Sequence, residues 1–193
     1  MKKLLLLSVS LLIASNILSQ VSTPKCQSYS EDKQLAKYMF DKINQYRNSL
    51  GELSYIWSEP QYQTSIKWNN YLSENALYGH RKGPEWIDMG GSELIGGVTL
   101  SDSVYNIIDS DLYEYVADSM VMQWIHSPYH HPMLKAPRRT ETKPYARLDW
   151  NEDGHIERFD VSLMKYGAIS VNINRYEHYT IVQCIFHLMD VIE

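Results

Sequence analysis

The chain has few of the features that identify the common enzyme and nucleic-acid-binding families. Its 193 residues include only two cysteines, and they contain no CxxC pair, phosphate-binding loop, nucleophile elbow or paired-histidine zinc-protease helix. Positive charge is also scarce, with 18 Lys and Arg residues against 23 Asp and Glu residues. Binding to a phosphate backbone needs a basic surface, so we expect no nucleic-acid partner.

Long apolar runs are confined to the N-terminus. Met1, Lys2 and Lys3 precede a mostly apolar run without charge over residues 4–18. This run is short for a membrane span and lacks a stop-transfer pattern, so it predicts a signal peptide over residues 1–20. The protein is then secreted or periplasmic, with no membrane span after the signal is removed. An uncleaved N-terminal anchor is the alternative.

The remaining chain, about 173 residues, is long enough for one domain with its own core. We divide it into an N-terminal arm over residues 21–34 and a single domain over residues 35–193. Residues 1–20 contain two of the 18 basic residues and no acidic residue, so the remainder has 16 basic and 23 acidic residues and a net charge of −7. Its 15 tyrosines and five tryptophans favour an amphipathic exterior, often one that faces carbohydrate or the cell surface, although many of them must lie in the core.

The two cysteines, Cys26 and Cys184, lie near opposite ends of the chain. An oxidising compartment favours a disulfide between them, and two free thiols are the alternative. Closing a loop of about 160 residues would stabilise the fold by roughly 4–5 kcal/mol.

Three helices are predicted from capping residues and from apolar periodicity. The first begins at Ser30 and ends near Gly51, which suits a left-handed cap. The second begins at Ser58, and the third begins near Ser110 and stops before Pro128, which disfavours helical geometry at the preceding residue. The apolar positions of the first helix recur every three or four residues, at Leu35, Met39, Ile43, Tyr46 and Leu50.

The last third of the chain alternates in the manner of strands. Residues 145–150 and 155–160 flank an Asn-Glu-Asp-Gly turn, and residues 167–173 and 179–186 form a second hairpin. The glycine-rich residues 83–103 are expected to be irregular. Helices that are segregated from an antiparallel sheet predict an α+β fold.

The segment after the third helix carries a resemblance to a known family. Trp124 is followed by Ser127-Pro128-Tyr129-His130, which resembles the Trp-x-x-Ser-Pro-Gly-His segment of the bacterial, SCP-like extracellular branch of the CAP superfamily (cysteine-rich secretory proteins, antigen 5 and pathogenesis-related proteins). The resemblance extends from about residue 35 to residue 186. It also includes Asn44-Gln45-Tyr46-Arg47, Trp68, His80, Gly91-Ser92-Glu93 and the final strands Tyr166–Val171 and Tyr179–Phe186.

The resemblance implies a CAP-like three-layer α-β-α sandwich with a central antiparallel sheet, and a cleft that contains His80, Glu93 and His130. The chain departs from the family in three ways. Tyr129 stands where the family has glycine, residues 135–163 look like a hairpin insertion, and a second glutamate is missing. His126, one helical turn before His130, is the best substitute for that glutamate.

Three interpretations of the cleft remain open. His80, His130 and Glu93 fit an open zinc site with a fourth position for water, which requires the two rings to lie within about 4 Å of each other. A carboxylate beside a histidine also fits a metal-free acid/base pair. The structural alternative is that Glu93 only satisfies hydrogen-bond donors between two helix ends.

The resemblance favours a binding or interaction module for a lipid, a glycan or a cell-envelope component over catalysis. The alternative is a metal-dependent hydrolase that uses His80, Glu93 and His130, with zinc as the one cofactor to consider. The other histidines are weaker candidates for the site. His131 is either a surface residue or a second ligand, and His187 is expected to be a residue at the edge of the fold.

Overall fold

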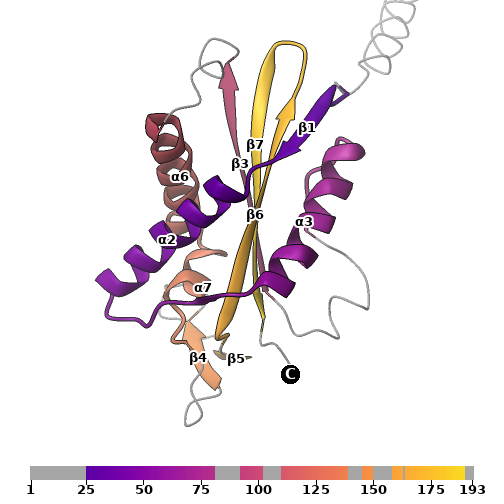
Figure 1. The fold of residues 1–193 in the computed structure, drawn as a ribbon. Coiled ribbons are helices and arrows are strands. Elements are labelled where there is room, and N and C mark those ends of the chain that lie inside the picture. The colour runs from indigo at the N-terminus through magenta and orange to yellow at the C-terminus, as the bar shows by residue number, and fades with distance from the viewer. Residues whose placement is uncertain are drawn as a thin grey trace, which may run out of the picture.

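The structure is a computed structural model that describes residues 25–80, 92–101, 110–138, 145–149, 158–162 and 164–189 (Figure 1). It has the predicted α+β character, with helices packed on a sheet whose long strands are antiparallel. The predicted signal peptide, residues 1–20, lies outside the described residues. No helix in the part of the chain that the structure describes is long and apolar enough to cross a membrane.

The main sheet has the strand order β1-β6-β7-β3. Its strands are β1 (Ser28–Glu31), β6 (Tyr166–Arg175), β7 (Tyr179–Met189) and β3 (Ser92–Ser101), and the short strand β2 (Ile56–Trp57) pairs in parallel with β6. The β6–β7 hairpin confirms the second predicted hairpin. The N-terminal arm also contributes, because β1 pairs along β6.

The prediction that residues 83–103 are irregular is wrong for residues 92–101, which form β3 and pair with β7 along their whole length. Gly96, one of the glycines that suggested a loop, serves close packing instead. A Cβ at this position would clash with the end of the Met120 side chain and lie 3.1 Å from Trp124 Nε1, so a larger residue would displace the methionine and crowd the indole.

The first helix, α2 (Lys33–Ser49), begins later than predicted. Ser30 lies in β1, and the N-cap is Asp32, whose carboxylate accepts a hydrogen bond from Leu35 N at 2.8 Å. The strand pairing of β1 with β6 keeps Ser30 and Glu31 extended, so the helix cannot begin there. Gly51 has a φ of 79° and confirms the predicted left-handed end.

The other helices begin close to their predicted positions. Helix α3 (Glu59–Glu74) has Ser58 as its N-cap, and helix α6 covers Ser110–Ile125. The Ser-Pro turn then leads into a short helix, α7 (His131–Lys135), with Pro132 in its first turn.

The helices divide between the two faces of the main sheet (Figure 1). Helices α2 and α6 contact one face: Cys184 Sγ lies 3.6 Å from Met39 Sδ, and the rings of Trp124 and Phe186 have centroids 6.2 Å apart. Helix α3 covers the other face, where Ser65 Oγ lies 2.7 Å from Ser170 Oγ. The first face is apolar, whereas the α3 face includes buried polar side chains, at Ser65, Asn69, Ser73, Ser170, Asn172, Asn174, Gln183 and His187.

A buried arginine joins α2 to α7. Arg47 Nη1 donates to the carbonyls of Leu134 at 2.7 Å and Ala136 at 2.8 Å, while Nε and Nη2 donate to Leu53 O. Its guanidinium carbon lies 3.7 Å from the centroid of the Tyr55 ring. Arg47 therefore fixes α7 and the turn before it against α2.

The predicted insertion contains a separate two-stranded sheet of β4 (Tyr145–Asp149) and β5 (Arg158–Ser162), which extends away from the main sheet in Figure 1. This pairing confirms the first predicted hairpin, with its second strand shifted toward the C-terminus. Residues 150–157, between the strands, lie outside the described residues.

The predicted Cys26–Cys184 disulfide is absent, and both cysteines are free. Cys26 precedes β1 and Gln27 N donates to Arg175 O at the hairpin end of β6, whereas Cys184 lies in the middle of β7. Arg175 pairs with Thr180, so Cys184 is four residues further along β7, or about 13 Å at the usual rise of a strand. A disulfide requires the two Cα atoms to lie within about 7 Å of each other.

Helix α6 also holds β3, the last strand in the sheet order. Trp124 Nε1 donates to Ile95 O at 3.2 Å, and Gln123 Nε2 donates to Gly97 O at 3.3 Å. These two bonds place the C-terminal part of α6, and the turn that follows it, beside β3.

Candidate functional site

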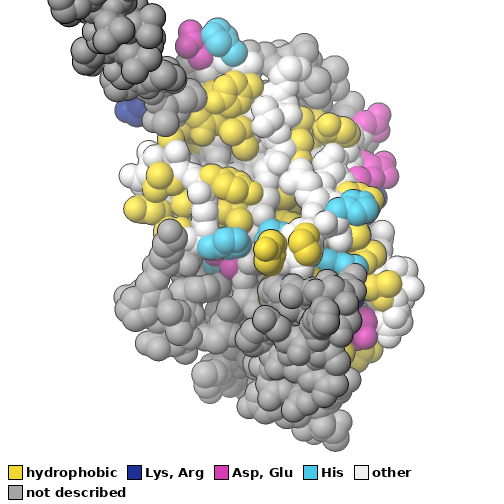
Figure 2. All heavy atoms as spheres, turned by 180° about the vertical axis from the view of Figure 1, so that it is seen from behind, with side chains coloured by type: hydrophobic (Ala, Val, Ile, Leu, Met, Phe, Trp, Pro, Cys, Tyr) yellow, Lys and Arg dark blue, Asp and Glu magenta, His cyan; other side chains and the backbone are white. Residues whose placement is uncertain are grey.

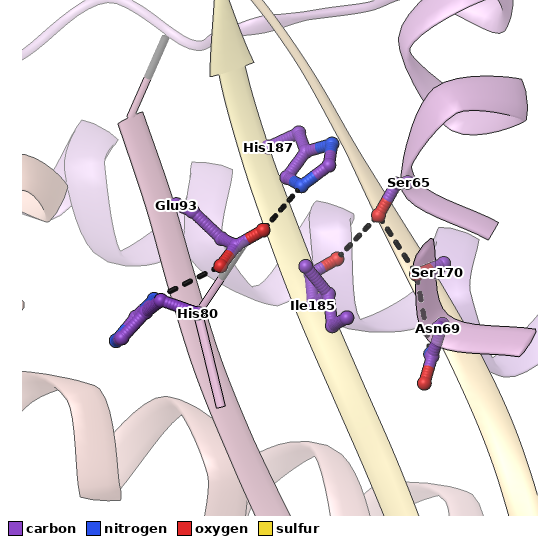
Figure 3. A network of polar contacts seen from close by, with 7 residues as sticks. All are labelled: Ser65, Asn69, His80, Glu93, Ser170, Ile185 and His187. Carbon is purple, nitrogen blue, oxygen red and sulfur yellow. Dashed lines mark hydrogen bonds and ion pairs between the residues drawn. The ribbon is translucent and has the colours of Figure 1, made fainter. Parts of the chain in front are cut away.

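The centre of the candidate site is Glu93, whose carboxylate binds an imidazole ring with each of its oxygens (Figure 3). Oε1 lies 2.9 Å from His80 Nδ1, and Oε2 lies 2.7 Å from His187 Nε2. Only 2% of the Glu93 side chain is exposed. The charge of a buried carboxylate needs hydrogen-bond donors, and the two rings supply them.

His187 was not predicted as part of the site, and its expected position at the edge of the fold is wrong. It lies in β7 directly opposite Glu93 of β3, and its side chain is fully buried. The alternation of β7 contains the signal, because Gln183, Ile185 and His187 share the face that α3 covers. The pairing becomes visible only once residues 92–101 are recognised as a strand.

His130 reaches the site from the other side of the sheet. Its ring centroid lies 6.1 Å from that of His80, at an interplanar angle of 53°. His80 follows α3 and His130 follows α6, so the two rings come from helices on opposite faces and meet beside β3. The structure therefore brings together the three residues that the sequence singled out, His80, Glu93 and His130.

Local backbone geometry fixes His130. It is the N-cap residue of α7, and its backbone N donates to the carbonyl of Ser127 at 3.2 Å and to the Ser127 hydroxyl at 3.3 Å. Tyr129, the residue directly before His130, points outward and is 67% exposed. The turn accepts this side chain because the ring lies in solvent.

The electrostatics of the site act on His130. Burial lowers the pKa of its imidazole from the ordinary value, and the neighbouring His80 lowers this pKa further. His130 therefore favours its uncharged form more than an ordinary histidine does. An uncharged imidazole offers one N–H donor and one nitrogen acceptor.

Two further histidines of this region lie apart from the site. His126 is exposed, and among the described residues no hydrogen bond or ring contact joins it to His80, Glu93 or His130, so it does not take the place of the missing glutamate. His131 is held by α2, with its Nε2 2.8 Å from the Tyr46 hydroxyl. This contact joins the beginning of α7 to α2.

The described residues do not form a zinc site. They contain no group of three or more His, Cys, Asp or Glu side chains arranged to hold a metal ion. Each oxygen of Glu93 instead lies within hydrogen-bonding distance of an imidazole nitrogen, Oε1 of His80 and Oε2 of His187. The direct contact between the carboxylate and the His80 imidazole fits both the acid/base pair and a structural role for Glu93.

A second polar network lies on the same face of the sheet (Figure 3). Ser65 Oγ donates to Ile185 O at 3.1 Å, and Asn69 Nδ2 donates to Ser170 Oγ at 3.2 Å. These contacts fasten α3 to β6 and β7. These contacts do not involve Glu93, His80 or His187.

Comparisons with known proteins give one result. No protein-family model matches the chain, and no curated protein matches it. Among solved structures, the chain is similar to an outer surface protein from Borrelia burgdorferi, with 14% sequence identity and a TM-score of 0.45. This similarity covers 84% of the present chain and 100% of the other.

Proposed function

We propose that the chain is a CAP-like, SCP-like extracellular domain that binds a cell-envelope component through the site formed by His80, Glu93 and His130. The proposal includes a three-layer α-β-α sandwich and export to the periplasm or the cell exterior. The direct contact between His80 and Glu93, with His130 beside it, carries the proposal. These residues come from three separate segments, in the order that the family pattern implies.

The chemistry of the site fits a glycan better than a lipid phosphate or another anion. Glu93 is buried and directed at its two imidazole partners, so the groups left for a ligand are the rings of His80 and His130. The lowered pKa of His130 favours its uncharged form, and an uncharged ring exchanges hydrogen bonds with hydroxyl groups.

Aromatic side chains close to these histidines in the sequence support the same class of ligand. Tyr78 and Tyr129 are 62% and 67% exposed. Aromatic rings of this kind combine an apolar face with a polar tip, which suits the apolar faces and hydroxyls of a sugar. Figure 2 shows histidines next to hydrophobic side chains on the face opposite to that of Figure 1, with few Lys or Arg side chains.

Binding to glycans tests the proposal. The purified protein is incubated with isolated cell-wall polysaccharide and with a glycan array, and the bound fraction is measured for the wild type, His130→Gln and His178→Gln. His178 is the matched control, because it lies exposed in the β6–β7 turn. We expect His130→Gln to weaken binding at least tenfold and His178→Gln to leave it unchanged. Equal binding by all three proteins, or binding by none, contradicts the proposal.

The alternative is a metal-dependent hydrolase that uses His80, Glu93 and His130. Metal analysis of protein purified without chelator, paired with His130→Ala, separates the two functions. Zinc at one equivalent that is lost in His130→Ala would support the hydrolase. Glycan binding that is unaffected by chelator, without release of shortened product, supports the binding module.

Export is tested on its own. Mass spectrometry of the protein recovered outside the cytoplasm should show a chain that begins near residue 20, as the signal-peptide pattern predicts. An intact Met1 in that material contradicts cleavage of the segment.

A further inference from the structure

The contacts around Glu93 connect the interior of the protein to the candidate site. His187 is fully buried, Glu93 is almost fully buried, and 51% of the His80 side chain is exposed. The three side chains follow one another in hydrogen-bonding distance, 2.7 Å and then 2.9 Å (Figure 3). A change at the buried His187 can therefore reach the exposed ring of His80 through Glu93.

The backbone under His187 is rigid. Strand β7 is paired on both sides, so that His187 faces Glu93 of β3 on one side and Ala168 of β6 on the other. The Ala168 side chain is a single methyl group, which leaves the imidazole room on that side. Functional groups on paired strands are held more accurately than groups on loops.

The hydrogen bonds determine where the hydrogens lie. An ionised carboxylate only accepts hydrogen bonds, so the nitrogens that face Glu93, His80 Nδ1 and His187 Nε2, must carry a hydrogen. A neutral His80 ring with its hydrogen on Nδ1 has an acceptor lone pair on Nε2. Figure 3 shows that the second nitrogen of His80 points away from Glu93, so this acceptor is the atom available to a ligand.

We propose that His187 is a positioning residue of this site: it holds Glu93 in the rotamer that keeps the hydrogen of His80 on Nδ1. Without the bond to His187, Oε2 loses this donor in a buried place, and the carboxylate rotates or takes up a proton to compensate. A protonated or rotated carboxyl group no longer selects the Nδ1–H form of His80. The role rests on the proposed function only in that it treats His80 Nε2 as the ligand-facing atom.

Nitrogen-15 NMR of the imidazole rings tests the proposal without any ligand. The two ring nitrogens give separate shifts that report which one carries the hydrogen, and His80→Gln assigns the His80 signals. Spectra are recorded on the full chain up to alkaline pH, where the rings are neutral. We expect the wild-type His80 ring in the Nδ1–H form. His187→Met has a side chain of similar size but no donor. We expect it to raise the ratio of the Nε2–H form to the Nδ1–H form of His80 at least twofold.

Two variants separate positioning from a general structural effect. His187→Gln can still donate to Oε2 from its side-chain amide, so we expect it to retain the Nδ1–H form of His80. Ser170→Ala removes hydrogen bonds of the second network on the same face of the sheet and should leave the His80 shifts unchanged, although it lowers stability. If His187→Met does not fold, His187→Asn, whose amide is too short to reach Oε2, replaces it with the same expectation.

The outcomes are distinct. A wild-type His80 ring with its hydrogen on Nε2, or a folded variant without a donor at position 187 that keeps the Nδ1–H form, overturns the positioning role. Failure of the protein to bind any glycan overturns the proposed function instead, because the NMR measurement contains no ligand.

Discussion

The guanidinium of Arg47 stacks on the ring of Tyr55, 3.7 Å from its centroid, while its nitrogens donate to three backbone carbonyls. Arg47 thereby connects α2 to two backbone segments, one at Leu53 and the other at the C-terminal end of α7. The corner that carries His130 is therefore held by a residue that lies in a different helix and far away in the sequence.

Replacement of Arg47 should destabilise the fold strongly. Arg47→Met keeps much of the volume but removes the donor from the buried carbonyls of Leu134 and Ala136 and from the partly buried carbonyl of Leu53. We expect a loss of about 3 kcal/mol or more in the free energy of unfolding, measured by urea denaturation. Lys67→Met, at an exposed position of α3, should change it by about 0.5 kcal/mol or less. Equal effects of the two variants contradict the role of Arg47.

Two glycines of the sheet, Gly167 and Gly97, should respond differently to alanine. A Cβ at Gly167 would lie 2.7 Å from Phe186 Cε2 and 2.9 Å from Leu188 Cδ2, and the ring cannot move without disturbing the core. Gly167→Ala should cost about 1–3 kcal/mol of stability. Gly97→Ala has its nearest contact at 3.5 Å and should be neutral or slightly stabilising, because alanine is less flexible in a strand. Thermal unfolding of both variants checks the difference.

The thiols should behave as two separate groups. Cys26 is partly exposed, whereas Cys184 is fully buried, and burial raises the pKa of the Cys184 thiol. A thiol reagent should therefore label one cysteine in the native protein and two in denaturant. The unfolding midpoint should not change when a reducing agent is added. A lower unfolding midpoint in the presence of the reducing agent would contradict the free thiols and support the disulfide.

The lowered pKa of His130 predicts how stability depends on pH. Burial, and then His80, disfavour its protonated form in the folded state, so the unfolded state binds more protons just below the ordinary histidine pKa of about 6.5. Stability should therefore fall as the pH drops through that value and level off below the folded-state pKa. His130→Gln should remove part of this fall, whereas His178→Gln should leave it intact. Urea midpoints between pH 8 and pH 5 measure it.

Local sequence signals predict the parts of the fold that local chemistry determines. The N-cap at Ser58, the beginning of α6 and the β6–β7 hairpin follow from neighbouring residues, and the structure confirms them. Ser30 fails as a helix start because strand pairing with β6, a distant segment, decides its conformation. Strand β3 was missed for the same reason. Its glycines indicate a loop as long as the packing of α6 on Gly96 is unknown.

The site divides along the same line. His80, Glu93 and His130 were singled out through a resemblance to a family, and the structure brings them together beside β3. His187 was not identifiable, because its role depends on which residue lies opposite it in another strand. The zinc interpretation is also disfavoured, because the described residues contain no group of three or more His, Cys, Asp or Glu side chains that could hold a metal ion.

The hydrogen bonds from Trp124 and Gln123 to β3 also affect how the protein meets other chains. The last strand of an open sheet exposes backbone groups that can pair with a strand from a neighbouring molecule and so begin aggregation. At Ile95 and Gly97 the carbonyls already accept hydrogen bonds from an indole and a carboxamide of α6. An incoming strand would have to displace both side chains, so the helix that shapes the site also protects the sheet from self-association.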